Sequence, residues 1–164
     1  MHATQKRFIE QRFGAKDWYG RRSRGRRVLR EFSFEGSELF DWTLDRTERD
    51  ERGKETAIHS IWRHDDVGNE LLAVDAFECA SVKAAHDQLI ETLGDIESAA
   101  VERRTGKNVI GDVSFGLNDT MVLFARVNIV VMIRNAGRTV VKVSSIARAF
   151  DKTLEHRFES ERKR

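Results

Sequence analysis

The sequence predicts an α+β domain in which an antiparallel sheet of about six strands packs against two main helices. Three observations support this fold: several segments alternate apolar and polar residues, two segments repeat apolar residues every three or four positions, and 40% of the 164 residues are hydrophobic. A chain of this length and apolar content suits one core of ordinary size. We therefore expect a basic helical arm over residues 1–30 and a single domain over residues 31–164.

The first element is a short amphipathic helix over residues 4–13, which ends near Gly14. Nucleation makes an isolated helix of this length marginal, so we expect it to dock on the rest of the chain. The aromatic side chains expected to make this contact are Phe8, Phe13, Trp18 and Tyr19.

Positive charge is concentrated in the arm, where RRSRGRRVLR, residues 21–30, holds six arginines. Residues 1–30 carry a formal charge of +8 and residues 31–164 a charge of −6. Two interpretations stay open. Either the arm docks on the acidic body of its own or a neighbouring chain, or it binds the phosphates of nucleic acid, with Trp18 and Tyr19 stacking on unpaired bases. The arginines in question are Arg21, Arg22, Arg24, Arg26, Arg27 and Arg30.

Strands are expected in the first half of the domain. FDWTLDRT, residues 40–47, alternates strictly and is typical of a half-buried strand, whereas the charged residues 48–54 indicate a solvated turn. Residues 55–64 and 69–80 are β-rich and are separated by DDVGN, which predicts a hairpin. We expect most of the aromatic residues in this half to lie in the core; they are Phe32, Phe34, Phe40, Trp42 and Trp62.

Two serine-headed segments predict the main helices. Ser81 is a candidate cap for the first helix, and Ser144 or Ser145 for the second. Their apolar stripes are Ala85, Leu89, Leu93 and Ile96 in the first, and Ile146, Phe150, Leu154 and Phe158 in the second.

Further strands are expected between these helices. Residues 109–117 alternate, Asn118 and Asp119 form a turn, and residues 121–137 form an apolar run broken near Asn128, which is a candidate for a bulge. TVVKV, residues 139–143, predicts a last strand. Each half thus reads as strands followed by a capped helix, an order that fits either a true duplication or coincidence.

The second half resembles part of a pattern in bacterial surface lipoproteins and kinase-linked extracellular sensor domains. The likeness covers residues 109–154 and rests on matched positions Gly111, Asp112, Arg126, Asn128, Ile146, Ala147, Asp151 and Leu154. It implies an antiparallel sheet partly wrapped by helices, with a ligand-binding groove and no shared catalytic residues. This chain departs from the family in lacking its paired cysteines, an export signal and an early lipidation cysteine.

Arg126 interrupts a very apolar stretch, and a buried guanidinium needs a partner. We expect either an ion pair with Asp112 or a pocket in which Arg126 meets a small anionic ligand. The residues proposed to bind a ligand are Arg126, Trp62, His86 and Asp112.

Support for catalysis or metal binding is limited. His59 and His64 differ by five positions, so they point to opposite faces of a strand, and no metal or other cofactor is predicted. Asp75 and Glu78 are a candidate acid/base pair, and His86 is expected on a partly exposed helix surface. A small enzyme with its site around His59, Trp62, Asp75 and His86 is the second alternative to a binding module.

Composition sets the remaining expectations. Cys79 is the only cysteine, which excludes an intramolecular disulfide and favours a buried thiol, and no segment is apolar enough to span a membrane. A cytoplasmic location is expected, or an extracytoplasmic one if a leader has been removed. We expect a non-catalytic ligand- or partner-binding module that forms a homodimer, with the arm as the exchanged element. A nucleic-acid-associated protein is the first alternative.

Overall fold

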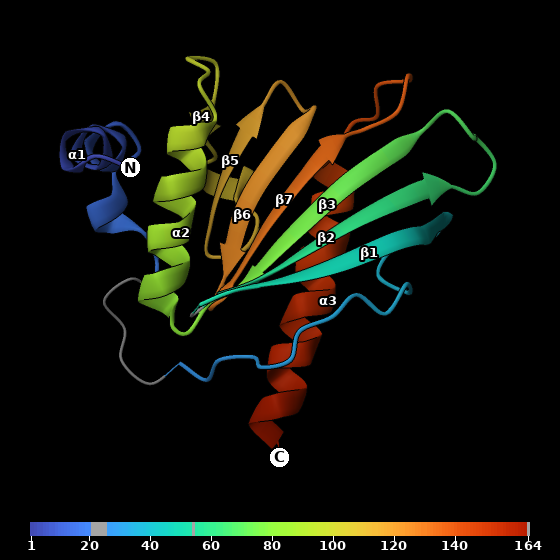
Figure 1. The fold of residues 1–164 in the computed structure, drawn as a ribbon, viewed down its shortest axis with the longest axis horizontal. Coiled ribbons are helices and arrows are strands. Elements are labelled where there is room, and N and C mark those ends of the chain that lie inside the picture. The colour runs from blue at the N-terminus through green and yellow to red at the C-terminus, as the bar shows by residue number, and fades with distance from the viewer. Residues whose placement is uncertain (21–25, 54, 164) are drawn as a thin grey trace.

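The computed structural model describes residues 1–20, 26–53 and 55–163 and contains one seven-stranded sheet in the order β1-β2-β3-β7-β6-β5-β4 (Figure 1). All neighbouring strands are antiparallel. The strands are β1 (Trp42–Arg52), β2 (Glu55–His64), β3 (Leu71–Glu78), β4 (Glu102–Arg103), β5 (Val113–Leu117), β6 (Met121–Arg126) and β7 (Ile129–Asn135). The helices are α1 (Ala3–Arg12), α2 (Val82–Asp95) and α3 (Ser144–Lys163), with 3-10 turns at Ala15–Asp17 and Gly106–Asn108. The predicted α+β class is confirmed, with one strand more than expected.

The two main helices lie on opposite faces of the sheet. In Figure 1, α3 passes behind the strands, whereas α1 and α2 lie on the other side. Strand β7 shows why both faces need cover: Val130 packs in the cluster under α2, and Val131 packs in the cluster under α3. Successive side chains of a strand point to opposite faces, so an apolar run such as IVVMI makes both faces apolar.

Capping and turn chemistry fix the ends of these elements. The side chain of Ser81 accepts a hydrogen bond from Ala84 N at 3.1 Å, as its predicted capping role requires. Asp119 Oδ1 accepts from Ser144 N at 2.9 Å and so caps the start of α3 from the β5–β6 turn. Asn118 and Asp119 both have positive φ, which is typical of a tight hairpin turn.

The α3 face is completed by an extended segment, residues 26–41, which runs beside α3 without joining the sheet (Figure 1). Its side chains Leu29, Phe32 and Phe34 are buried in the same cluster as Trp62 and Phe150. Since this segment lacks strand partners, side chains satisfy its backbone. Asn128 bonds both the N–H and the C=O of Leu29 at 2.9 Å, and Glu78 accepts from Phe32 N at 2.6 Å.

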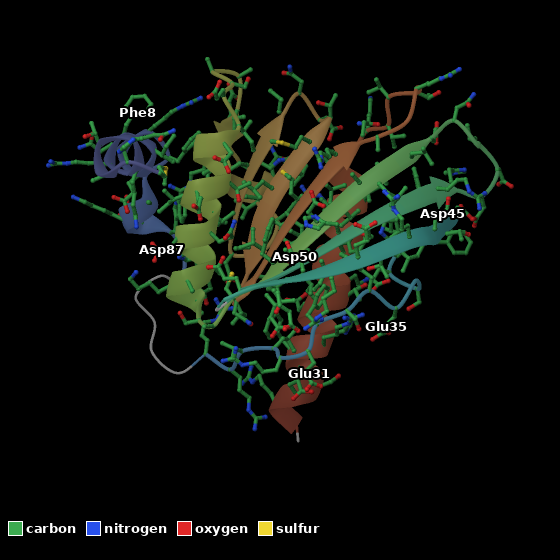
Figure 2. All side chains as sticks on the ribbon, viewed as in Figure 1. Phe8, Glu31, Glu35, Asp45, Asp50 and Asp87 are labelled. Atoms are coloured by element: carbon green, nitrogen blue, oxygen red, sulfur yellow. The ribbon has the colours of Figure 1, made fainter. Side chains whose placement is uncertain are left out.

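On the other face, α1 packs against α2 through fewer aromatic residues than the sequence predicts. Phe13 and Trp18 are buried as expected, together with Ile9. The prediction was wrong for Phe8 and Tyr19, whose side chains are 60% and 67% exposed. Figure 2 shows Phe8 on the outer side of α1. The helix turns Ile9 and Phe13, four positions apart, toward α2, so Phe8 faces away.

Three strand predictions differ from the structure. Residues 48–52 continue strand β1 instead of forming a turn, because a charged edge strand tolerates side chains that face solvent. A bulge between Leu44 and Arg46 reverses the alternation, which moves Arg46 to the opposite face from Trp42 and Leu44. Residues 139–143 form no strand, and Val141 is held instead by the side chain of Asn135.

Most of the other sequence features lie where they were expected. Four of the five early aromatic side chains are buried, the exception being Phe40, which is 90% exposed. Cys79 is fully buried, and burial, with Glu55 and Glu78 nearby, raises the pKa of its thiol to about 12. The two halves share the order of strands followed by a serine-headed helix, although their helices return to opposite faces. Among the described residues, no helix combines the length and apolarity needed to cross a membrane.

Replacing Trp18 with alanine is expected to lower the free energy of unfolding by about 3–5 kcal/mol. Trp18 lies against Phe115 and His86, with ring centroids 5.4 and 5.5 Å away, and its Nε1 donates to Phe13 O. The control is Tyr19→Ala, at the exposed neighbouring position, which we expect to cost less than about 0.5 kcal/mol. If urea denaturation showed the same loss of unfolding free energy for both variants, the N-terminal segment would not dock as described.

Replacing Asn128 with alanine is expected to destabilise the fold by about 2–4 kcal/mol, because it leaves buried backbone groups of Leu29 and Cys79 without partners. Asn108→Ala, at an exposed position, provides a matched control. Guanidinium denaturation of both variants measures the difference. A loss below about 1 kcal/mol for Asn128→Ala would contradict the role assigned to this side chain.

Candidate ligand-binding groove

Helix α2 covers only part of its face of the sheet, and the uncovered part over β2, β3 and β7 forms a groove beside the helix. We call it the α2 groove; its volume is about 620 Å³. It is lined by Glu55, Ala57, His59, Asp75, Phe77, Gln88, Glu91, Thr92, Asp95, Ile96, Met121, Met132 and Arg134. The contributing elements are three neighbouring strands, the adjacent start of β6, and α2 with the residue that follows it.

Strand register places the polar centre of the groove. His59 on β2 lies directly opposite Asp75 on β3, and Asp75 lies opposite Met132 on β7. Directly opposite residues of an antiparallel pair project to the same face, about 5 Å apart at Cβ. The register therefore brings an imidazole and a carboxylate together on the open face.

Asp75 is held by two basic side chains. Its Oδ1 lies 2.8 Å from Nδ1 of His59, and its Oδ2 accepts from the guanidinium of Arg134 at 3.3 Å. The Asp75 side chain is only 7% exposed, whereas those of His59 and Arg134 are 40% and 54% exposed. The carboxylate is thus buried at the base of the cluster, and its two partners reach solvent or a bound molecule.

The opposite wall of the groove is acidic. Glu55, at the start of β2, lines the groove together with Glu91 and Asp95 of α2. Burial, followed by the charges of Glu91 and Asp87, raises the pKa of Glu55 above its ordinary value. The carboxylates of this wall therefore repel one another, and a bound cation or a proton would reduce that repulsion.

An apolar floor joins the two polar regions. Ala57, Phe77 and Met132 contribute from three adjacent strands, and Met121 and Ile96 close the side toward α2. Phe77 and Met132 are partly exposed members of the cluster under α2. The groove thus combines an apolar surface with a few convergent polar groups, which is the usual composition of a small-molecule site.

The four residues proposed from sequence to bind a ligand do not meet in one place. Trp62 is fully buried on the α3 face, where its Nε1 donates to Ser60 Oγ at 3.0 Å. His86 is also fully buried, beneath Trp18, and not on a partly exposed surface as predicted. Trp18 from the N-terminal segment covers it, which the pattern of α2 alone does not reveal.

Arg126 and Asp112 belong to a separate cluster near α3. The predicted partner Asp112 lies 3.9 Å from Arg126 Nη1, but the closer partner is Asp151 of α3, which accepts two hydrogen bonds at 2.7 Å. Asp112 instead accepts from Arg26 at 2.6 Å and from Val127 N at 2.8 Å. Asp151 also accepts from Gly111 N, so four positions of the family resemblance meet in this cluster.

The described part of the arginine run contacts its own chain. Arg26 pairs with Asp112, Arg27 donates to Glu161 O, and Arg30 donates to Ala80 O. Arg21, Arg22 and Arg24 lie outside the described residues. Trp18 is buried and has no face free for a base, whereas Tyr19 is exposed. Binding of nucleic acid through this run stays a prediction.

Two further candidate pairs separate in space. Asp75 faces the groove, but Glu78 lies on the α3 face, where it bonds Phe32 N, so they form no acid/base pair. His64 faces away from His59, as predicted, and packs on Trp42 with ring centroids 5.1 Å apart. Across the described ranges, no three His, Cys, Asp or Glu side chains gather closely enough to hold a metal ion.

Sequence reasoning found His59 and Asp75 but not the rest of the groove. Arg134 and Glu91 were missed because they come from β7 and α2, which no local pattern connects to β2 and β3. Glu55 was missed although it lies on the same face of β2 as His59, four positions earlier. A signal was present in β3, where the set that contains Asp75 alternates with the apolar residues Leu72, Val74 and Ala76. A polar residue at alternate positions indicates a face that no helix covers.

Comparison of this chain with protein-family models, curated proteins and solved structures finds no match.

Replacing Glu55 with glutamine is expected to raise the free energy of unfolding at pH 7. Because its pKa is raised in the fold, the charged carboxylate costs stability above that pKa. The gain should shrink as pH falls through the raised pKa toward the ordinary value of 4.5, and it should vanish at lower pH, where the carboxyl is protonated in both states. Urea denaturation across this range measures it.

Glu97→Gln, at an exposed position after α2, is the matched control and should change stability little at any pH. A Glu55→Gln variant less stable than the wild type at pH 7 would contradict the unfavourable charge assigned to Glu55.

Proposed function

We propose that the protein is a ligand-binding module that holds a small organic molecule in the α2 groove. The observation that carries this proposal is the meeting of an apolar floor with the His59–Asp75–Arg134 cluster in one concavity of about 620 Å³. Sites for small molecules usually measure about 300–1,000 Å³ and combine apolar walls with few polar groups. The groove has both properties.

The charges of the groove favour a ligand with a positively charged or hydrogen-bond-donating group. Asp75 is already compensated by His59 and Arg134. By contrast, burial and then the nearby charges of Glu91 and Asp87 disfavour the ionised form of Glu55, so the carboxylates of Glu55 and Glu91 repel each other. A cation placed between them relieves this repulsion, while its apolar body covers Phe77 and Met132.

The small anionic ligand expected at Arg126 has weaker support. Three carboxylates surround this guanidinium: Asp151 at 2.7 Å, Glu155 at 3.8 Å and Asp112 at 3.9 Å. Their combined negative charge more than offsets that of Arg126, which weakens the attraction of this guanidinium for an anion. The ligand proposal therefore centres on the α2 groove.

Self-association through exchange of the arm also stays a prediction. In a single chain, Arg26 already pairs with Asp112 and Leu29 already pairs with Asn128. A dimer that exchanged this segment would make the same contacts between chains. Exchange would therefore add no new buried surface at these positions.

The ligand proposal predicts that 4-phenylbutylamine binds at least about tenfold more tightly than 4-phenylbutyrate, a difference of about 1.4 kcal/mol. The two molecules share an apolar body and differ in the sign of their charge, so they separate the apolar floor from the acidic wall. Titration with each, followed by the NMR signal of the Met132 methyl group, measures both affinities.

The double variant Glu55→Gln/Glu91→Gln should reduce the preference for the amine while retaining binding of the apolar body. Glu97→Gln is again the control. Preferential binding of the carboxylate would contradict the charge argument, and no shift at Met132 with either molecule would contradict a ligand site in the groove.

A further inference from the structure

The contact between His59 and Asp75 has the geometry of a general base and the group that orients it. Their side chains meet at 2.8 Å from directly opposite strand positions, so both are fixed by the sheet and not by a loop. We propose that the α2 groove also hydrolyses neutral carboxylic esters, with His59 as the general base. This inference rests on the proposed binding function and adds a reaction to it.

Asp75 determines which nitrogen of His59 acts. An ionised carboxylate only accepts hydrogen bonds, so the neutral imidazole places its proton on Nδ1, facing Asp75. The lone pair then lies on Nε2, the ring atom directed away from Asp75. The His59 side chain is 40% exposed and lines the groove, so a water molecule beside a bound ligand can approach its ring.

Arg134 keeps this arrangement in place. It holds Oδ2 of Asp75 at 3.3 Å, so Oδ1 stays directed at His59. Asp75 is nearly buried, which strengthens its interaction with an imidazolium ion as that ion forms. Asp75 is therefore a positioning residue, and its charge stabilises the protonated state of the base.

The reaction needs no reagent other than water. Nε2 of His59 takes a proton from a water molecule while the water oxygen bonds to the acyl carbon and the carbonyl electron pair moves onto oxygen. The half-exposed guanidinium of Arg134 stabilises that oxyanion. The C–O bond to the alcohol then breaks, and the alcohol oxygen takes the proton back from His59, giving one acid and one alcohol.

Two hydroxyl groups near His59 and the groove, those of Ser60 and Thr92, already donate hydrogen bonds elsewhere. Ser60, the hydroxyl nearest to His59 in sequence, lies on the opposite face and donates to Val74 O at 2.7 Å. Thr92 on α2 donates to Gln88 O at 2.9 Å. A direct attack by water therefore fits the groove better than a covalent acyl intermediate.

The floor of the groove defines the class of ester. Phe77 and Met132 offer an apolar surface beside His59, which suits a short acyl chain on an aromatic alcohol. The substrate class is therefore a neutral ester with a small apolar acyl group, for which p-nitrophenyl butyrate is a convenient probe.

The test measures release of p-nitrophenolate from p-nitrophenyl butyrate by the full chain and three variants. His59→Gln should lower kcat/KM by about 10²–10⁴-fold, the range that general-base catalysis contributes. Asp75→Asn should lower kcat by at least about tenfold with KM little changed, because it acts on the base and not on binding. His156→Gln, an identical change at an exposed position of α3, should have no effect.

A loss below about tenfold for His59→Gln overturns the inference, as does a wild-type rate no higher than that of free imidazole at equal concentration. The second comparison requires no variant to fold. An Asp75→Asn variant that changes KM alone also overturns it, because Asp75 would then serve only to shape the groove.

A ketone that cannot be hydrolysed, 1-phenylbutan-1-one, separates this inference from the proposed function. If the ketone shifts the Met132 methyl signal and the ester is not cleaved, catalysis fails and ligand binding stands. If the ketone does not bind but 4-phenylbutylamine does, the ester inference fails and the proposed ligand binding stands. If neither molecule shifts the Met132 signal, both fail.

Discussion

The structure depends on one constraint: a sheet that is apolar on both faces must be covered on both. On one face α3 is too narrow to cover the strands alone, so the extended segment 26–41 lies beside it and buries Leu29, Phe32 and Phe34. That segment has no strand partner, and its backbone groups would be costly to bury unpaired. Side chains of Asn128 and Glu78 bond them instead. Buried polar residues are thus placed where a non-strand segment crosses the core.

The other face is covered unequally, and this inequality creates the α2 groove. Helix α2, supported by α1, packs over β6, β7 and the adjoining part of β3, whereas among the described residues no helix packs on this face of β1 or β2. Polar residues can occupy the uncovered strands because they are not sealed from water. His59, Asp75 and Arg134 meet there through strand register alone. The arrangement is rigid because the three strands that carry it are hydrogen-bonded along their length.

The alternating and helical patterns of apolar residues were sufficient to predict the α+β fold class, both main helices and most strands. Burial of one face makes apolar residues recur with the period of the strand or helix that carries them. They failed where tertiary contacts decide. A bulge moved Arg46 to the other face, and Trp18 covered His86, which α2 alone would leave partly exposed. Arg126 was correctly expected to need a carboxylate, but its main partner, Asp151, comes from a helix 25 positions away. Only His59 and Asp75 of the groove were predicted, because the pattern of a single strand does not reveal its register with the neighbouring strands.

Unequal cover of the sheet is tested most directly by the accessibility of methyl groups that alternate along the same strands. A soluble paramagnetic agent broadens NMR signals of exposed methyl groups. The account predicts strong broadening for Ile61 of β2 and Met132 of β7, which face the open side, and little for Ile58 and Ile133, which face α3. Equal protection of all four would mean that another surface, such as a second copy of the chain, covers the open half, and the groove as described would not exist.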